Sequence, residues 1–151
     1  YKVLWNRMPP DLLPLYQIEK DLTISLLGIE ARGMAIDKKY VTKQRKEYGD
    51  RIYRIKHRIG EIAGEEFNPQ SPKQIIEVFA QRGVRITATD KATLLSVDDE
   101  LANMIVELRE ANKIKATYLD ALAEEAKDGI LHPNFRQHGT RTGRMSSGAA
   151  Q

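Results

Sequence analysis

The spacing of apolar residues along the chain predicts a helix that begins among the prolines of residues 9–14 and ends near Gly33. Apolar side chains there recur every three or four residues, as on one face of a helix, at Leu15, Ile18, Leu22, Leu26 and Ile29. Pro9, Pro10 and Pro14 restrict where this helix can start, because proline is tolerated in the first turn but not further inside a helix.

A second and longer helix is predicted from Asp37, which is placed to cap it, to Ala63, with Gly64 as its stop. Its apolar positions step by four, three, four and three residues, at Tyr48, Ile52, Ile55, Ile59 and Ile62. Such a narrow stripe suits one partner helix. The helix would be about 40 Å long at 1.5 Å per residue.

A third helix is predicted over roughly residues 98–127, with apolar positions at Leu101, Ile105, Leu108, Ala111, Tyr118 and Leu122. We expect it to pair antiparallel with the second. Between the two, Ser71 and Pro72 indicate the start of a short helix over 75–82, and another turn or short helix begins near Thr93.

Helical periodicity is lost after Gly129, so residues 130–151 are expected to form a strand or extended loop without a sheet to complete. The predicted fold class is therefore mainly α: two long antiparallel helices with a small helical tip, and a short C-terminal β or extended segment.

Composition narrows the class of protein. The 151 residues, 41% hydrophobic and 30% charged, suit one small domain. No apolar run approaches the ~20 residues of a membrane span and no secretory leader is seen, and the absence of cysteine removes disulfides and thiolate chemistry. Because the chain starts at Tyr1 and stops at Gln151 in a Ser-Gly-Ala-Ala run, we expect it to be a piece of a longer protein.

The charges are balanced in total, with 24 Lys and Arg against 21 Asp and Glu, but they are unevenly distributed. Residues 38–58 hold nine bases against two acids, and residues 131–151 hold Arg136, Arg141 and Arg144 with no acid. Pooled bases favour a surface that meets a polyanion. For residues 38–58 alone, an exposed helix that carries lysines for solubility explains the pattern as well.

The sequence contains no recognisable catalytic motif. The three histidines, His57, His132 and His138, have no partners at metal-binding spacing. Ser146 and Ser147 lack a nucleophile elbow, and Gly143 and Gly148 belong to no phosphate-binding loop.

Groups suited to phosphate binding gather at four places instead. They are Asn68, Ser71 and Lys73 at a helix start; Thr93 at another; Arg109 and Lys113 one turn apart; and Arg141 with Arg144 in the tail. Free backbone N–H groups at a helix start attract anions. Ser71 and Thr93 could equally be plain helix caps, and Arg109 could pair with Glu107, Glu110 or a facing helix. No pattern for reading base sequence is present.

Four ordered blocks resemble family A DNA polymerases, from about residue 15 to 147. Residues 140–147, TRTGRMSS, resemble the T-x-T-G-R-[LM]-S-S signature that begins the palm, and residues 109–119, REANKIKATYL, resemble a segment of the long thumb helix. Residues 61–74, EIAGEEFNPQSPKQ, are similar to the block at the thumb tip, and residues 30–37, EARGMAID, to the stretch that enters the thumb.

The resemblance implies a division into the end of an exonuclease-like region (1–33), a thumb (34–129) and the start of a palm (130–151). By the same resemblance, Arg144 reaches the minor-groove side of the primer terminus, and Arg109 and Lys113 contact the duplex backbone. Asn68, Ser71 and Lys73 grip phosphates at the tip. Thr93 matches a neighbouring tip hydroxyl more loosely, and Arg141 is included only for its charge.

The resemblance also implies a monomer whose partner is primer-template duplex DNA, in the cytoplasm of a bacterial or phage-infected cell or in an organelle. The family's nucleotide-binding helix and the two aspartates that hold Mg²⁺ come after the signature, so dNTP binding and metal are expected of the parent protein alone, and these 151 residues alone should be inactive. The rival interpretation is a non-catalytic helical adaptor whose bases are merely solvated.

Overall fold

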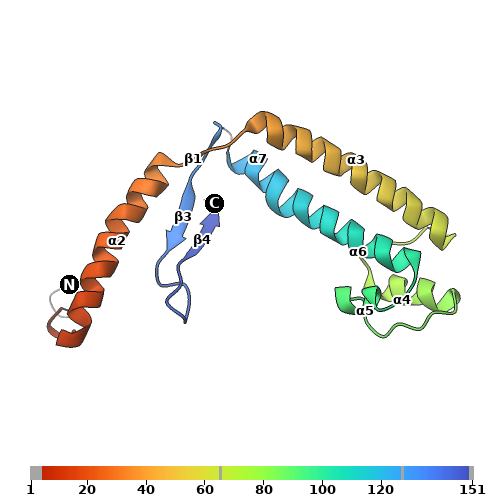
Figure 1. Ribbon diagram of the computed structural model, residues 1–151, viewed down its shortest axis with the longest axis horizontal. Coiled ribbons are helices and arrows are strands. Elements are labelled where there is room, and N and C mark those ends of the chain that lie inside the picture. The colour runs from red at the N-terminus through yellow and green to blue at the C-terminus, as the bar shows by residue number, and fades with distance from the viewer. Residues whose placement is uncertain (1–4, 65, 127, 150–151) are drawn as a thin grey trace. The chain divides into compact units, whose positions relative to one another are not determined.

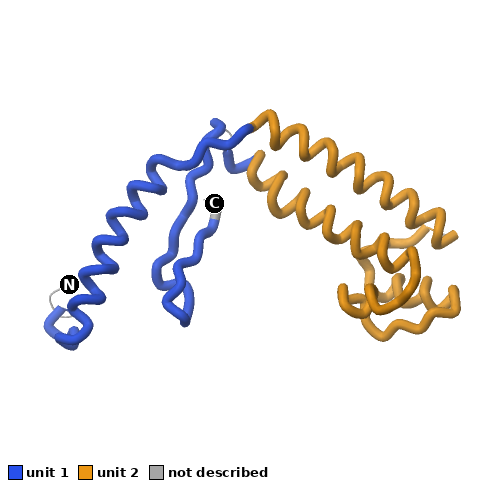
Figure 2. The backbone as a smooth tube through the Cα atoms, in the orientation of Figure 1, with its two compact units in different colours: residues 1–37, 124–151 blue, residues 38–123 orange. Residues whose placement is uncertain are grey.

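The computed structural model describes residues 5–64, 66–126 and 128–149. The chain divides into two compact units (Figure 2): residues 1–37 together with 124–151 form unit 1, and residues 38–123 form unit 2. None of the helices in the described part is both long enough and apolar enough to cross a membrane.

Unit 2 is built on two long helical segments that lie side by side (Figure 1). Helix α3 spans Lys38–Ala63, and the return segment runs from α6 (Glu100–Lys113) through a π-helical stretch (Ile114–Asp120) into α7 (Ala121–Glu125), whose last two residues belong to unit 1. Cross-pairs join the start of α3 to the end of the return segment, Arg45 with Asp120, and the end of α3 to the start of α6, Arg58 with Glu100. The predicted antiparallel pair is thus confirmed.

The small tip between these helices consists of α4 (Pro72–Gln81) and α5 (Lys91–Leu95). Its apolar residues share one core with the two long helices. Fully buried side chains in that core are Ile75 and Phe79 of α4, Leu94 of α5, and Leu101, Ile105 and Leu108 of α6. The α3 positions predicted to face a partner all join it, with Ile55 and Ile59 buried and Tyr48, Ile52 and Ile62 packed at its edge.

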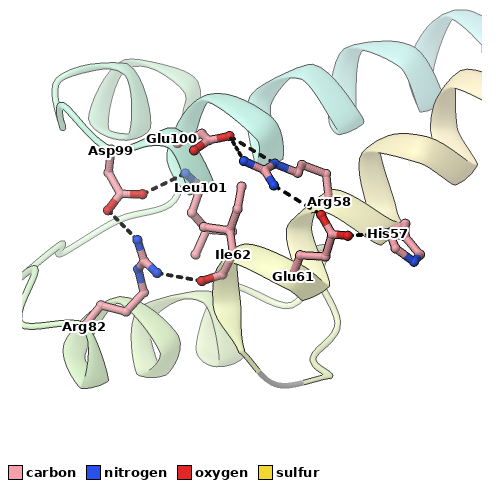
Figure 3. A network of polar contacts seen from close by, with 8 residues as sticks. All are labelled: His57, Arg58, Glu61, Ile62, Arg82, Asp99, Glu100 and Leu101. Carbon is pink, nitrogen blue, oxygen red and sulfur yellow. Dashed lines mark hydrogen bonds and ion pairs between the residues drawn. The ribbon is translucent and has the colours of Figure 1, made fainter.

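One arginine ties the tip to both long helices (Figure 3). Arg82, just after α4, donates to the backbone carbonyl of Ile62 near the end of α3 at 2.8 Å. It also donates to Asp99 at 3.1 Å, and the other oxygen of Asp99 accepts the backbone N–H of Leu101 at the start of α6. Three chain segments are therefore fixed to one another where the tip begins.

Unit 1 contains a short 3₁₀ turn (Pro10–Leu12), helix α2 (Leu13–Arg32) and two small antiparallel sheets. Strand β1 (Met34–Ala35) pairs with β2 (Ile130–Leu131), and β3 (Pro133–Arg136) pairs with β4 (Ser146–Ala149) in the register Pro133 to Ala149 and Arg136 to Ser146. Gly33 ends α2 with φ +67°, and a Cβ there would lie 2.4 Å from the Ile130 side chain, so only glycine fits the turn.

The mainly α fold with a short β segment is confirmed, but two details of the prediction are wrong. The C-terminal segment does not lack a partner, because β3 and β4 fold back on each other and β2 pairs with β1. Tyr118 is 54% exposed, while Leu119 is buried instead. Both residues lie in the π-helical stretch Ile114–Asp120, where the backbone departs from the 3.6-residue period on which the prediction rests.

Candidate nucleic-acid interface

The basic cluster of residues 38–58 is partly neutralised within unit 2. Arg45 lies 2.7 Å from Asp120, Arg51 lies 2.7 Å from Glu107, and Arg58 lies 3.0 Å from Glu100. Hydrogen bonds from Lys115 and then from Arg45 lower the pKa of Asp120. These arginines therefore join the two long helices. The positive charge of this cluster that remains for a polyanion is smaller than its nine bases suggest.

The tip residues Asn68, Ser71 and Lys73 do lie together, around the start of α4. Ser71 is the N-cap, and its hydroxyl accepts the backbone N–H of Gln74 at 3.5 Å. The Asn68 side-chain oxygen accepts the N–H of Gln70 at 2.9 Å, while the Asn68 N–H donates to the Gln74 side chain at 2.6 Å. Within the described residues, the Asn68 amide NH₂ and the exposed Lys73 ammonium make no hydrogen bond or ion pair.

Thr93 is not the cap of its helix, which corrects the sequence-based prediction. Helix α5 begins two residues earlier, and Asp90 caps it by accepting the N–H groups of Ala92 and Thr93 at 3.0 and 3.1 Å. The Thr93 hydroxyl donates to the second carboxylate oxygen of Asp90 at 2.6 Å. This bond, with the backbone N–H of Thr93, lowers the pKa of Asp90. The start of α5 therefore carries a negative charge.

Arg109 and Lys113 share one side of α6 but have different surroundings. The half-buried guanidinium of Arg109 donates to the backbone carbonyl of Thr89 and, at 3.4 Å, to the Thr89 hydroxyl. Arg109 thereby holds the loop before α5, and it does not form the ion pair with Glu107 or Glu110 that the sequence allowed. Glu107 pairs with Arg51, and Glu110 with Lys91. Lys113, at the end of α6, is exposed.

Arg141 and Arg144 lie in unit 1, on the loop that joins β3 to β4. Both are exposed. Gly143, between them, adopts φ +72°, a conformation that favours glycine. The backbone carbonyl of Arg144 accepts the Thr140 hydroxyl at 2.5 Å, which closes the loop on itself.

The β3–β4 hairpin is anchored on α2 by residues that the sequence analysis did not single out. The Gln137 amide donates to Glu19 at 2.9 Å and accepts the Thr23 hydroxyl at 2.7 Å. Glu30 accepts the backbone N–H of Phe135 at 2.6 Å, and its own carbonyl bonds the ring of His132 at 2.7 Å. These contacts join positions more than 100 residues apart, so no local sequence signal could reveal them.

Other contributors at the interface were also missed, and for some of them a signal existed. Asp90 precedes a helix, where aspartate is a favoured cap, and Gln74 follows Ser71 at the capping-box spacing. The role of Thr89, which depends on a side chain 20 residues away, had no such signal. In the described part of the chain, no three His, Asp or Glu side chains lie close enough to share a metal ion.

Comparison with known proteins identifies the family. Residues 38–150 match the sequence profile of DNA polymerase family A. The chain belongs to DNA polymerase family A. The match covers the long helices, the tip and the β3–β4 hairpin with its loop.

Individual relatives agree with this membership. DNA polymerase I of Helicobacter pylori (strain 26695) is 35% identical over 138 residues, which is 87% of this chain and 16% of the relative. The thermostable DNA polymerase I of Thermus aquaticus is 30% identical over 161 residues, 95% of this chain and 19% of the relative. The chain thus spans less than a fifth of the length of these family A relatives.

A solved structure shares the fold. The POL domain of Pol1 from M. smegmatis, in complex with DNA primer-template and dNTP, matches 85% of this chain and 25% of its own, with a TM-score of 0.74 and 26% sequence identity. That protein was solved with DNA bound.

Proposed function

We propose that this chain is the thumb and the beginning of the palm of a DNA-directed DNA polymerase, and that it holds primer-template duplex during DNA synthesis in replication or repair. The observation that carries this proposal is the family A match over residues 38–150. The DNA-bound state of the similar POL domain supports it.

The available donors fit a sequence-independent grip on DNA. Lys73 and Lys113 in unit 2, and Arg141 and Arg144 in unit 1, are exposed cations that no carboxylate neutralises within the described residues. Contacts to phosphates give affinity for any sequence, which a polymerase needs as it moves along a template. Minor-groove contacts, proposed for Arg144, tolerate every correct base pair.

The residues at the helix starts have more restricted roles in this proposal. Asn68 offers its free amide to a phosphate, while Ser71 shapes the start of α4 as its cap. Arg109 orders the Thr89 loop besides any contact it makes with the duplex backbone. Thr93, whose hydroxyl is held by Asp90, would reach a phosphate only by giving up that bond.

The proposal divides the chain into residues 1–33, 34–129 and 130–151, as the end of an exonuclease-like region, the thumb and the start of the palm. It assigns dNTP binding and nucleotidyl transfer to the longer polymerase. The described residues do not fit a Mg²⁺ site, so we derive no metal-dependent step from them. We further propose that the polymerase is monomeric and works in the cytoplasm of a bacterial or phage-infected cell.

The decisive experiment measures binding of the 151-residue chain to a fluorescently labelled primer-template duplex at low salt. The proposal expects binding with the same affinity for duplexes of unrelated sequence. The rival function, a helical adaptor protein, expects no binding to DNA under the same conditions.

A further inference from the structure

A groove lies between α3 and the loop that leads into α4, outside the positions assigned so far except Asn68. It encloses about 300 Å³ and is lined by Lys56, Ile59, Gly60, Glu66, Phe67, Asn68 and Pro69. Its walls come from two segments, the last turns of α3 and the tip loop.

Two hydrogen-bond donors line this groove without partners among the residues that the structure describes. The Asn68 side chain uses its oxygen for the N–H of Gln70, which leaves its NH₂ group to donate elsewhere. The Lys56 ammonium is exposed and makes no hydrogen bond or ion pair within the described residues. Two neighbouring bases of α3 differ, since Arg51 and Arg58 are paired with carboxylates of α6.

The floor of the groove allows a close approach to the helix. Gly60 follows Lys56 by one turn and so lies on the same side of α3. A Cβ added at Gly60 would meet no heavy atom within 4 Å. The space above this backbone is therefore open to a ligand, with a cationic donor beside it and an amide donor across from it.

We propose that this groove binds a phosphate of the DNA backbone between Lys56 and Asn68, which extends the grip of the tip onto α3. The inference rests on the proposed function, because it takes duplex DNA as the ligand. An ammonium and an amide NH₂ are both donors and suit phosphate oxygens. The Glu66 carboxylate on the same wall opposes the phosphate and limits the affinity of the site.

The test compares duplex affinity and its salt dependence for the 151-residue chain and single variants. Lys56→Gln is expected to reduce the magnitude of the slope of log affinity against log salt by about 0.9. The ratio of wild-type to variant affinity should therefore fall roughly threefold between 50 and 200 mM salt. Arg54→Gln is the matched control, because residues two apart on a helix do not face each other. It should leave the slope at the wild-type value. Glu66→Gln should raise the affinity.

Gly60→Leu separates binding from folding. Leucine favours helix more than glycine does, so the melting temperature should stay level or rise while the side chain fills the groove and duplex affinity falls severalfold. Equal slopes for Lys56→Gln and Arg54→Gln, or unchanged affinity for Gly60→Leu, would refute phosphate binding in the groove. Either result would leave the proposed function intact. A wild-type chain that does not bind duplex would overturn both.

Discussion

Arg109 of α6 donates from its guanidinium to the backbone carbonyl of Thr89, the last residue before the Asp90 cap of α5. Thr89 is buried to 9% exposure, although it is a polar residue in a loop. A basic residue that resembles a DNA contact thus also holds the backbone of the tip.

Arg109→Ala should therefore affect folding as well as DNA binding. A hydrogen bond from a charged donor to the carbonyl of a buried residue contributes about 1.5–3 kcal/mol. We expect a loss of that size in the free energy of unfolding, measured by chemical denaturation, together with faster amide hydrogen exchange over residues 85–90. Lys113→Ala is the control, since Lys113 is exposed at the end of the same helix. Unchanged exchange in Arg109→Ala would show that the Thr89 contact does not order the loop.

Arg82 provides a second structural prediction, because its guanidinium links the carbonyl of Ile62 to the carboxylate of Asp99. Arg82→Ala should cost about 2 kcal/mol, since Asp99 and the carbonyl both lose a charged partner. Arg58→Ala removes a more exposed pair, with side-chain exposures of 52% and 56% for Arg58 and Glu100, and should destabilise the fold less than Arg82→Ala does. Thermal denaturation of both variants measures the difference, and equal costs would contradict the linking role of Arg82.

The pH dependence of stability follows from carboxylates that hold partners only in the folded state. The pKa of Asp90 is lowered by Thr93, that of Glu110 by Lys91, and that of Asp120 by Lys115 and Arg45. A lowered pKa means that the folded state binds the proton less readily than the unfolded chain. The contribution of these carboxylates to the stability of the fold is complete at pH values above their ordinary pKa of about 4. It is lost as the pH falls through their lowered pKa values.

The melting temperature should consequently be level from pH 7 to about pH 5 and fall below about pH 4. Asp120→Asn should flatten part of that fall, because the variant has no carboxylate to protonate at this position. A melting temperature that rises on acidification would contradict the stabilising role of these three carboxylates.

Arg144 is the residue to test in the longer polymerase that we propose contains this chain. Its resemblance to the arginine beside the primer terminus predicts that Arg144→Ala lowers the rate of primer extension more than it lowers duplex affinity. Arg141→Ala, on the same exposed loop, should instead weaken duplex binding with little change in the extension rate. Single-turnover extension and equilibrium binding separate the two effects, and an unchanged rate in Arg144→Ala would refute its role at the primer terminus.

The sequence predicted the helical framework well because its signals are local. Gly33 and Gly64 end their helices as expected, both with positive φ, and Ser71 caps α4. The stripe from Tyr48 to Ile62 meets its partner helix because the apolar period alone defines that face.

Other features depend on contacts between distant residues, and the sequence could not predict them. The bases of residues 38–58 formed one cluster in the sequence, yet Arg45, Arg51 and Arg58 are paired with acids that lie 42 to 75 residues further along. The hairpin of β3 and β4 is held on α2 through Gln137 and Glu30. Local propensity carries no information about such pairs. The resemblance to family A polymerases pointed to the residues that we propose bind DNA, but the bond from Arg109 to Thr89 comes from the structure alone.

The most direct test of the proposed DNA grip is the salt dependence of duplex binding by the 151-residue chain. If three to five phosphates are neutralised, the slope of log affinity against log salt should be roughly −2.7 to −4.5, with no preference for sequence. Lys73→Gln combined with Lys113→Gln should reduce that slope by nearly 2, whereas Lys39→Gln with Lys46→Gln, two exposed lysines of α3, should leave it unchanged. Absence of binding at low salt, or a slope that only the α3 pair reduces, would contradict the account.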